Sequence, residues 1–147
     1  MKLLRLKSTD LHHLRQLNEV FSDAFEDPET HLTRKPNDLY LKNLLLKQDF
    51  IALAAIEDGK VLGGLVAYVL EKYEQERNEI YIYDLAVAEP FRRRGIAKSL
   101  IQYLKELAKE INVWVIFVQA DKEDTPAIRL YESYGKKEAP LHFDIFP

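Results

Sequence analysis

A run of cations followed by a glycine is the strongest chemical signal in this chain. Arg92, Arg93 and Arg94 precede Gly95, and apolar residues with helical spacing begin directly after that glycine. The first turn of a helix has unpaired backbone N–H groups and about half a positive charge, so it attracts phosphate. Glycine lets a phosphate approach the backbone, and the arginines add charge-assisted hydrogen bonds. We therefore expect a pyrophosphate site made of Arg92, Arg93, Arg94, Gly95, Ile96 and Ala97.

An aspartate inside an apolar strand is the second signal. Residues 79–87 (EIYIYDLAV) are the most β-prone segment of the chain, and Asp84 shares a face with the isoleucines of that strand unless a β-bulge intervenes. Partial burial raises the pKa of a carboxylate, which suits a general base, and we expect Asp84 to take a proton from an amine. Tyr83 and Glu79 are alternative bases. An internal ion pair with arginine or lysine is the structural alternative for Asp84.

Further carboxylates are spread along the chain. This arrangement suits a compact polycation, which needs anionic partners at several separate points. Asp121, Glu123 and Asp124 follow the apolar run 113–118, at the end where α/β units bind ligands, but they also suit a solvated loop in which Asp124 caps a helix. The expected acceptor-binding residues are Glu79, Asp84, Asp121, Glu123, Asp124 and Asp144, of which Glu79 and Asp144 also suit simple surface charge.

Composition bounds the class of protein. The 147 residues correspond to one domain, and 47% of them are hydrophobic, enough for a closed core. The net charge is −3, and the acidic and basic residues are interspersed without a basic stripe. Neither nucleic acid nor a membrane surface is therefore expected as a partner. The chain lacks cysteine, and its four histidines lack metal-ligand spacing, so we expect no metal. Without a signal-peptide pattern or a membrane span, a cytoplasmic location is expected.

Hydrophobic spacing predicts four helices that position these residues. Apolar residues recur at intervals of three and four in each of them. Asn37 or Asp38 is expected to cap the second helix, and Gly135 to end the last one in a left-handed conformation. Residues 26–38 are polar with two prolines and predict a surface loop or a broken short helix. The helices are expected at about residues 10–26, 39–46, 95–111 and 126–134.

Strands are expected between the helices. Asp58-Gly59 is a hairpin signal, because glycine accepts positive φ, and it predicts antiparallel pairing of strands 50–56 and 61–70. Strand 79–87, the third helix and strand 113–118 predict a parallel βαβ unit in which both strands are covered. The remaining strands are expected at residues 4–6 and 141–146. The last strand is apolar and would allow a homodimer.

Two segments carry a resemblance to a known superfamily. Arg92-x-x-Gly95-x-Ala97 resembles the Q/R-x-x-G-x-G/A signature of the GCN5-related N-acetyltransferases, and residues 127–135 (AIRLYESYG) resemble their A-x-x-L-Y-x-x-x-G segment. The resemblance implies a single α/β (α+β) domain over residues 1–147, with a mixed sheet of about six to seven strands and about four helices. Arg93, where many relatives have glycine, and Lys136, where an aromatic is common, depart from the pattern.

The superfamily resemblance also implies a mechanism. Acetyl-coenzyme A would be the co-substrate, and no metal would be needed. Tyr131 would protonate the departing thiolate of the coenzyme. Backbone groups at the splayed edge of strand 79–87 would pair with the pantetheine arm and receive the developing oxyanion, and they belong to Leu85, Ala86 and Val87.

A narrower resemblance covers residues 20–147. Residues 50–55 (FIALAA), 79–87, 119–121 (QAD) and 142–145 (HFDI) are similar to the aminoglycoside 3-N-acetyltransferases that modify gentamicin. This implies transfer of acetyl to the 3-amino group of the 2-deoxystreptamine ring, and hence antibiotic resistance. The alternatives are an acetyltransferase for another amine, such as a polyamine or a protein N-terminus, and a coenzyme A-binding module without catalysis.

Overall fold

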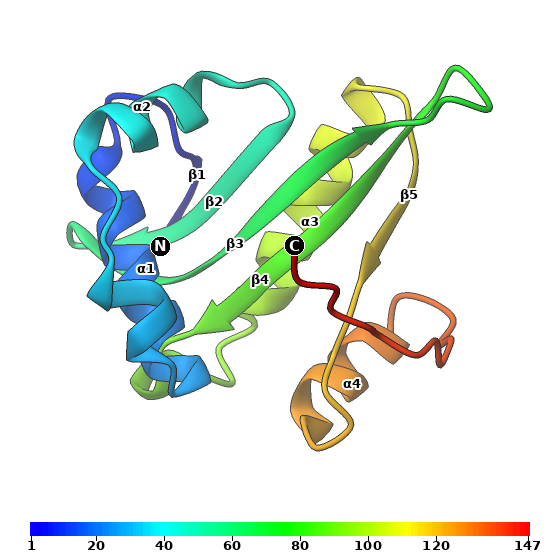
Figure 1. The fold of residues 1–147 in the computed structure, drawn as a ribbon. Helices are drawn as coiled ribbons and strands as arrows, with labels where there is room; N and C mark the ends of the chain where they lie inside the picture. The colour runs from blue at the N-terminus through cyan, green and yellow to red at the C-terminus, as the bar shows by residue number, and fades with distance from the viewer.

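A mixed five-stranded sheet with helices on both faces forms the body of the computed structural model, which describes residues 1–147 (Figure 1). The strand order is β1-β2-β3-β4-β5, antiparallel throughout except for the parallel pair β4–β5. The strands are β1 (Lys2–Arg5), β2 (Phe50–Glu57), β3 (Lys60–Glu71), β4 (Asn78–Val87) and β5 (Val113–Val118). The helices are α1 (Leu11–Phe25), α2 (Asp38–Leu46), α3 (Ile96–Glu110) and α4 (Thr125–Glu132), with a π-helical turn η1 (Glu29–Thr33) and a 3-10 turn η2 (Glu89–Phe91).

Two apolar clusters hold the sheet between its helices. On one face α1 and α2 pack on β2 and β3, with Leu17 and Phe21 of α1 almost completely buried. On the other face α3 contributes Leu100 and Leu104, which have no exposed surface. The helical spacing of apolar residues thus identified the faces that pack on the sheet.

Several local structures that the sequence predicted are present in the fold. Asp58 and Gly59 both have positive φ (50° and 75°) in the β2–β3 hairpin, as its tight turn requires. The Oδ1 atom of Asn37 accepts a hydrogen bond from the backbone amide of Tyr40 (2.9 Å), so Asn37 caps α2. Residues 26–38 were expected to form either a surface loop or a broken short helix. They contain the helical turn η1, which agrees with the second alternative.

The C-terminal part differs from the expectation. The sheet has five strands rather than six to seven, because residues 141–146 form no strand. No residue of β5 is fully buried, although burial was expected, because nothing pairs with its outer edge. Gly135 is not left-handed, because its amide reaches the carbonyl of Tyr131 (3.0 Å) and closes the end of α4 with ordinary φ. None of the helices combines the length and the apolar character needed to cross a bilayer.

Candidate active site

A splay between β4 and β5 creates an open strand edge. Their pairing ends at Ile82 and Val118, whereas β4 continues to Val87 with only β3 beside it. The amide of Ala88 donates to the carbonyl of Leu62 in β3 (2.8 Å), so the alternation of a strand turns the amides of Val87 and Leu85 to the opposite side. The structure therefore places the backbone of Leu85, Ala86 and Val87 at the splay, with the amides of Leu85 and Val87 directed into it.

A β-bulge decides the direction of Asp84. Val66 pairs with Asp84 and Ala67 pairs with Ile82, so Tyr83 is an extra residue that shifts the alternation of β4. After the bulge, Leu85 packs with the α3 cluster and Ala86 with the α1 cluster. Asp84 therefore leaves the face of the isoleucines and lies on the face that α1 and α2 cover in part.

The Asp84 carboxylate has no partner in the protein. No hydrogen bond or ion pair involves its side chain, so the alternative of an internal ion pair is wrong. Burial raises the pKa of Asp84, and the nearby His31 of η1 opposes part of that rise. A partly buried carboxylate without a cation is costly, and it favours the binding of an ammonium group.

Aromatic side chains lie around Asp84 on the same face. Tyr83 is 62% exposed, and its ring lies 5.9 Å from Tyr68 of β3 and 5.7 Å from Tyr81. Tyr81 stacks on Phe117 of β5 at 4.8 Å. Of these rings, only Tyr83 was expected at the site from the sequence. Tyr68 carries a usable signal, because it is the sole aromatic residue in the apolar run 61–70.

The start of α3 has the open backbone that a phosphate site needs. Gly95 is the N-cap with φ of 75°, and no side chain caps the helix. A Cβ at Gly95 would have no atom within 4 Å, so the first turn is accessible. Arg93 also has positive φ (65°), a conformation that glycine adopts more readily than arginine.

The three arginines before α3 have different environments. Arg92 donates from Nε to the carbonyl of Val87 (3.1 Å) and so ties the loop to the end of β4. Arg94 pairs with the Glu57 carboxylate at the end of β2 (Nη2 to Oε1, 3.0 Å). Arg93 is exposed and makes no hydrogen bond or ion pair. Of the three guanidinium groups, that of Arg93 is the one that is free to contact a ligand.

Tyr131 lies on α4, in the unit that follows β5. Its side chain is partly buried, and burial raises the pKa of Tyr131 to about 12, with Asp124 adding to the rise. The phenol therefore stays protonated at neutral pH and can donate a proton. Asp124 accepts a hydrogen bond from the amide of Ala127 (3.1 Å), as a helix cap does.

The other candidate carboxylates have environments that differ from that of Asp84. Glu79 pairs with Lys72 (3.8 Å) and lies five residues before Asp84, roughly 17 Å along the strand. Asp121 and Glu123 are exposed in the loop between β5 and α4. Asp144 pairs with His142 (2.9 Å) in the C-terminal segment.

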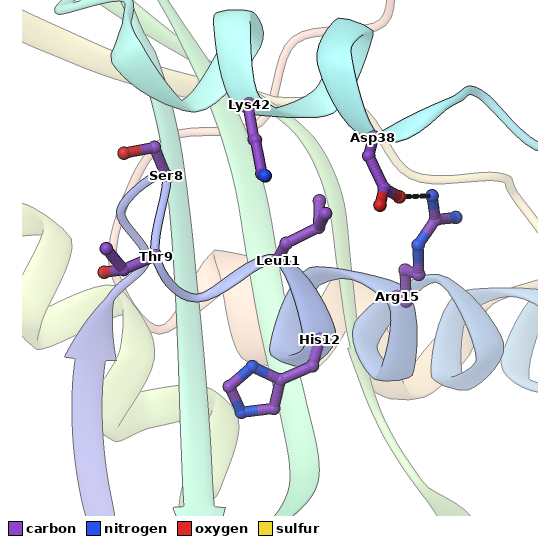
Figure 2. A pocket seen from close by; sticks show the side chains of 7 residues that line it. All are labelled: Ser8, Thr9, Leu11, His12, Arg15, Asp38 and Lys42. Carbon is purple, nitrogen blue, oxygen red and sulfur yellow. Dashed lines mark hydrogen bonds and ion pairs between the residues drawn. The ribbon is translucent and has the colours of Figure 1, made fainter.

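A separate hollow lies between the start of α1 and α2. Figure 2 shows the Arg15 guanidinium bridging to Asp38 of α2, with Nη2 to Oδ1 at 2.6 Å. His12 and Lys42 also line this hollow, so its only carboxylate is already paired and its other charged groups are basic. This environment disfavours a cationic acceptor.

Comparison with known proteins identifies the family. Residues 14–135 match the Acetyltransferase (GNAT) family over most of the chain. The chain belongs to the GNAT acetyltransferase family. The acetyltransferases of this family use acetyl-coenzyme A, and the fold is a mixed α/β GNAT fold, as the sequence predicted.

Two solved structures are similar to this GNAT protein over nearly all of its length. Aminoglycoside acetyltransferase HMB0005, from an uncultured soil metagenomic sample, has 50% identity and a TM-score of 0.97, with 99% of this chain and 97% of that chain covered. Aminoglycoside acetyltransferase meta-AAC0020, also from an uncultured soil metagenomic sample and in complex with sisomicin, has 35% identity and a TM-score of 0.92, with coverage of 99% and 95%.

Curated relatives include an enzyme that acts on a protein. The ribosomal protein bS18-alanine N-acetyltransferase of Salmonella typhimurium is 29% identical over 142 residues, which are 97% of this chain and 84% of that protein. The chain spans a smaller share, 66%, of the uncharacterized N-acetyltransferase YokL of Bacillus subtilis, at 30% identity over 121 residues. Both relatives are N-acetyltransferases, and the bS18 enzyme acts on a protein, whereas the two similar solved structures are aminoglycoside acetyltransferases.

Proposed function

We propose that this GNAT protein transfers acetyl from acetyl-coenzyme A to the 3-amino group of a 2-deoxystreptamine aminoglycoside such as gentamicin, and so confers resistance to it. The observation that carries the acceptor class is the unpaired, partly buried carboxylate of Asp84 beside the exposed ring of Tyr83. A carboxylate and a ring face together favour an ammonium group on a sugar-like ring. The similarity to two aminoglycoside acetyltransferases supports the same class.

The coenzyme would bind between the splay and the start of α3. The amides of Gly95, Ile96 and Ala97 form the uncapped first turn, which suits the pyrophosphate. Arg93 has a free guanidinium for a phosphate, while Arg92 and Arg94 hold the loop in place. The outward backbone of Leu85 and Val87 would pair with the pantetheine arm. When bound, acetyl-coenzyme A supplies an activated thioester.

The protein side chains would then move two protons. Asp84 takes a proton from the acceptor ammonium, directly or through water, and its raised pKa brings it closer to that of the amine. Tyr83, which is 62% exposed, and Glu79, through ordered water, are the alternative bases. Backbone amides at the splay stabilise the negative charge that develops on the carbonyl oxygen. Tyr131 donates its phenolic proton to the leaving sulfur.

One assay tests the acceptor. Purified protein is mixed with acetyl-coenzyme A and, separately, gentamicin, kanamycin, spermidine and a peptide, and release of free thiol is followed. We expect release with gentamicin, with the acetyl group on N3 of the deoxystreptamine ring by NMR. Expression in a susceptible bacterium should raise the inhibitory concentration of the drug. Thiol release with spermidine but with none of the other acceptors would contradict the proposal. If no acceptor caused thiol release, the protein would instead be a coenzyme A-binding module without catalysis.

A protein N-terminus is the second candidate acceptor. The match to the bS18-alanine N-acetyltransferase over 97% of this chain favours it. A peptide with N-terminal alanine in the same assay separates the two, because a peptide enzyme should accept it with a kcat/KM far above that for gentamicin. The compact carboxylate and aromatic arrangement around Asp84 favours the aminoglycoside.

A further inference from the structure

Helix α2 carries an exposed tyrosine near the rings that lie around Asp84. Tyr40 is 63% exposed in the first turn of this helix. The next residue, Leu41, is buried in the same apolar cluster as Phe50 of β2. The ring of Phe50 in turn lies 5.5 Å from that of Tyr68 in β3. The packing of α2 on β2 therefore brings Tyr40 to the part of the sheet that carries Tyr68.

The protonation of Tyr68 shows which polar groups share its surroundings. Burial raises the pKa of the Tyr68 phenol. Three further groups add to this rise, and in order of decreasing effect they are Tyr83, Tyr40 and Asp84. Such an effect weakens with distance, so the three groups lie near Tyr68. The Asp84 carboxylate is thus accompanied by tyrosines from three elements, which are β3, β4 and α2.

A carboxylate among aromatic rings is suited to an ammonium group. The face of a phenol ring attracts a cation, and the attraction is stronger where the cation is withdrawn from water. Tyr40 and Tyr83 are 63% and 62% exposed, so a ligand can reach both rings. The side chain of Asp84 makes no hydrogen bond or ion pair in the protein and can balance the positive charge.

The position of Tyr40 depends on a clamp at the start of α2. The Arg15 guanidinium of α1 donates from Nη2 to the carbonyl of Pro36 (3.2 Å) and to Oδ1 of Asp38 (2.6 Å). These acceptors lie on either side of Asn37, which caps α2 through the amide of Tyr40 (2.9 Å). Figure 2 shows the Arg15–Asp38 pair spanning the hollow between the two helices. One side chain of α1 therefore fixes the turn that carries Tyr40.

We propose that Tyr40 is an acceptor-binding residue, whose ring contacts an ammonium group held near Asp84, and that Arg15 is a positioning residue that acts through Tyr40. This inference rests on the proposed function, because it takes the face that carries Asp84 as the acceptor site. It adds an aromatic wall from α2 to that site. The site would then select acceptors that present an ammonium group between rings, since a neutral group gains no cation–π attraction from Tyr40.

The first test is a binding titration without acetyl transfer. Gentamicin is titrated by calorimetry into the protein saturated with coenzyme A. Tyr40→Ala should raise the dissociation constant about tenfold, because one cation–π contact is lost. Tyr40→Phe keeps the ring and should bind like the wild type. Tyr73→Ala, at a residue that is 99% exposed between β3 and β4, is the matched control and should also leave the affinity unchanged.

Either of two results would overturn the contact with the ring. One is equal affinity of Tyr40→Ala and the wild type, and the other is a Tyr40→Phe variant as weak as Tyr40→Ala. In the acetyl-transfer assay, Tyr40→Ala should raise KM for the acceptor while kcat and KM for acetyl-coenzyme A stay near the wild-type values. A fall in kcat alone would contradict a role in acceptor binding.

A double-mutant cycle tests the role of Arg15. Arg15→Ala should raise the dissociation constant of gentamicin about threefold, the size expected for loss of an exposed ion pair. Removal of a positive charge by itself would have the opposite effect on a polycation. Lys42→Ala removes an unpaired cation from the same hollow and should not weaken binding. In the Tyr40→Ala background, Arg15→Ala should change the affinity little, and fully additive effects would overturn the positioning role.

The titrations separate this inference from the proposed function. Gentamicin bound equally by the wild type and by Tyr40→Ala would overturn the inference alone. If the wild type does not bind gentamicin, the proposed acceptor is wrong, and spermidine replaces it in the same titrations because it also presents ammonium groups. Spermidine binding that Tyr40→Ala weakens would then support the aromatic wall. Binding that Tyr40→Ala leaves unchanged, or no binding of either amine, would overturn it.

Discussion

Asp84 shows how one extra residue changes the chemistry of a strand. Without the bulge at Tyr83, the carboxylate would point into the apolar cluster under α3, where a charge is very costly. With the bulge, it lies on the partly open face beside tyrosine rings. Partial burial at this position raises the pKa of Asp84.

Replacing Asp84 tests its role as the base. Asp84→Asn should lower kcat/KM about 100-fold or more, because an amide cannot take the proton. The wild-type rate should rise with pH through the raised pKa of Asp84, since only the carboxylate is active, and this acidic limb should vanish in the variant. Glu79→Gln, in the same strand but paired with Lys72, is the control. If Glu79→Gln removes the limb and Asp84→Asn retains it, Glu79 is the base.

Replacing Tyr131 tests proton donation to the leaving group. Tyr131→Phe should reduce kcat about 100-fold while affinity for acetyl-coenzyme A, measured by calorimetry, changes little. Since the pKa of Tyr131 is raised to about 12, its deprotonation should cause no fall in the wild-type rate below about pH 11. Tyr134→Phe, three residues further on, is the matched control. Equal kcat values for Tyr131→Phe and wild type would exclude the role.

At the scale of elements, the approach to α3 combines an open helix start with a fixed loop. Arg92 holds the loop to β4, and Arg94 holds it to the end of β2 through Glu57. The amides of the first turn are therefore kept in place beside the splay before any ligand binds. Such preorganisation reduces the entropy lost on binding.

Substitutions at two glycines distinguish an effect on phosphate binding from an effect of backbone strain. Gly95 and Gly59 share φ of 75°, and a methyl group added at either position would have no atom within 4 Å. Gly95→Ala and Gly59→Ala should each lower the free energy of unfolding by about 1 kcal/mol, because alanine disfavours this conformation. Gly95→Ala alone should weaken acetyl-coenzyme A binding, by about tenfold, since its methyl group obstructs the phosphate. Equal affinity for both variants in calorimetry would place the phosphate elsewhere.

For the whole molecule, Gly64 marks a place where β3 packs closely against both β2 and α1. A Cβ on Gly64 of β3 would overlap the carbonyl oxygen of Leu53 and come within 2.7 Å of Leu17 Cδ1. Backbone cannot yield as a flexible side chain can. The packing of α1 on the sheet through Leu17 therefore depends on the missing side chain at this position.

Substituting Gly64 should destabilise the fold. Gly64→Ala is expected to cost at least about 1–3 kcal/mol through overpacking, which lowers the melting temperature by several degrees. Gly135→Ala is the control, because it has ordinary φ and no atom within 4 Å of the added group, and its melting temperature should stay unchanged. Calorimetric unfolding of both variants checks this, and a stable Gly64→Ala would show that β2 and α1 can shift apart.

The sequence alone was sufficient for features that depend on neighbouring residues. Apolar spacing located the four helices and the first five strands, and Asp58-Gly59 and Asn37 specified a turn and a cap. The helix start at Gly95 could also be predicted from the sequence, because a few consecutive residues determine where a helix begins and where its partial charge lies. The same local signals indicated a strand at 141–146, which the single chain does not form.

Tertiary structure decided the features that depend on pairing between distant segments. The bulge at Tyr83 is defined by the register of β4 against β3, so only the folded sheet determines which face receives Asp84. Tyr68 and Phe117 meet the β4 tyrosines for the same reason. A strand at the C-terminus likewise needs an edge to pair with, since half of its hydrogen bonds belong to another segment. Local sequence sets the conformation that each segment prefers, whereas contacts between segments determine which side chains share a site.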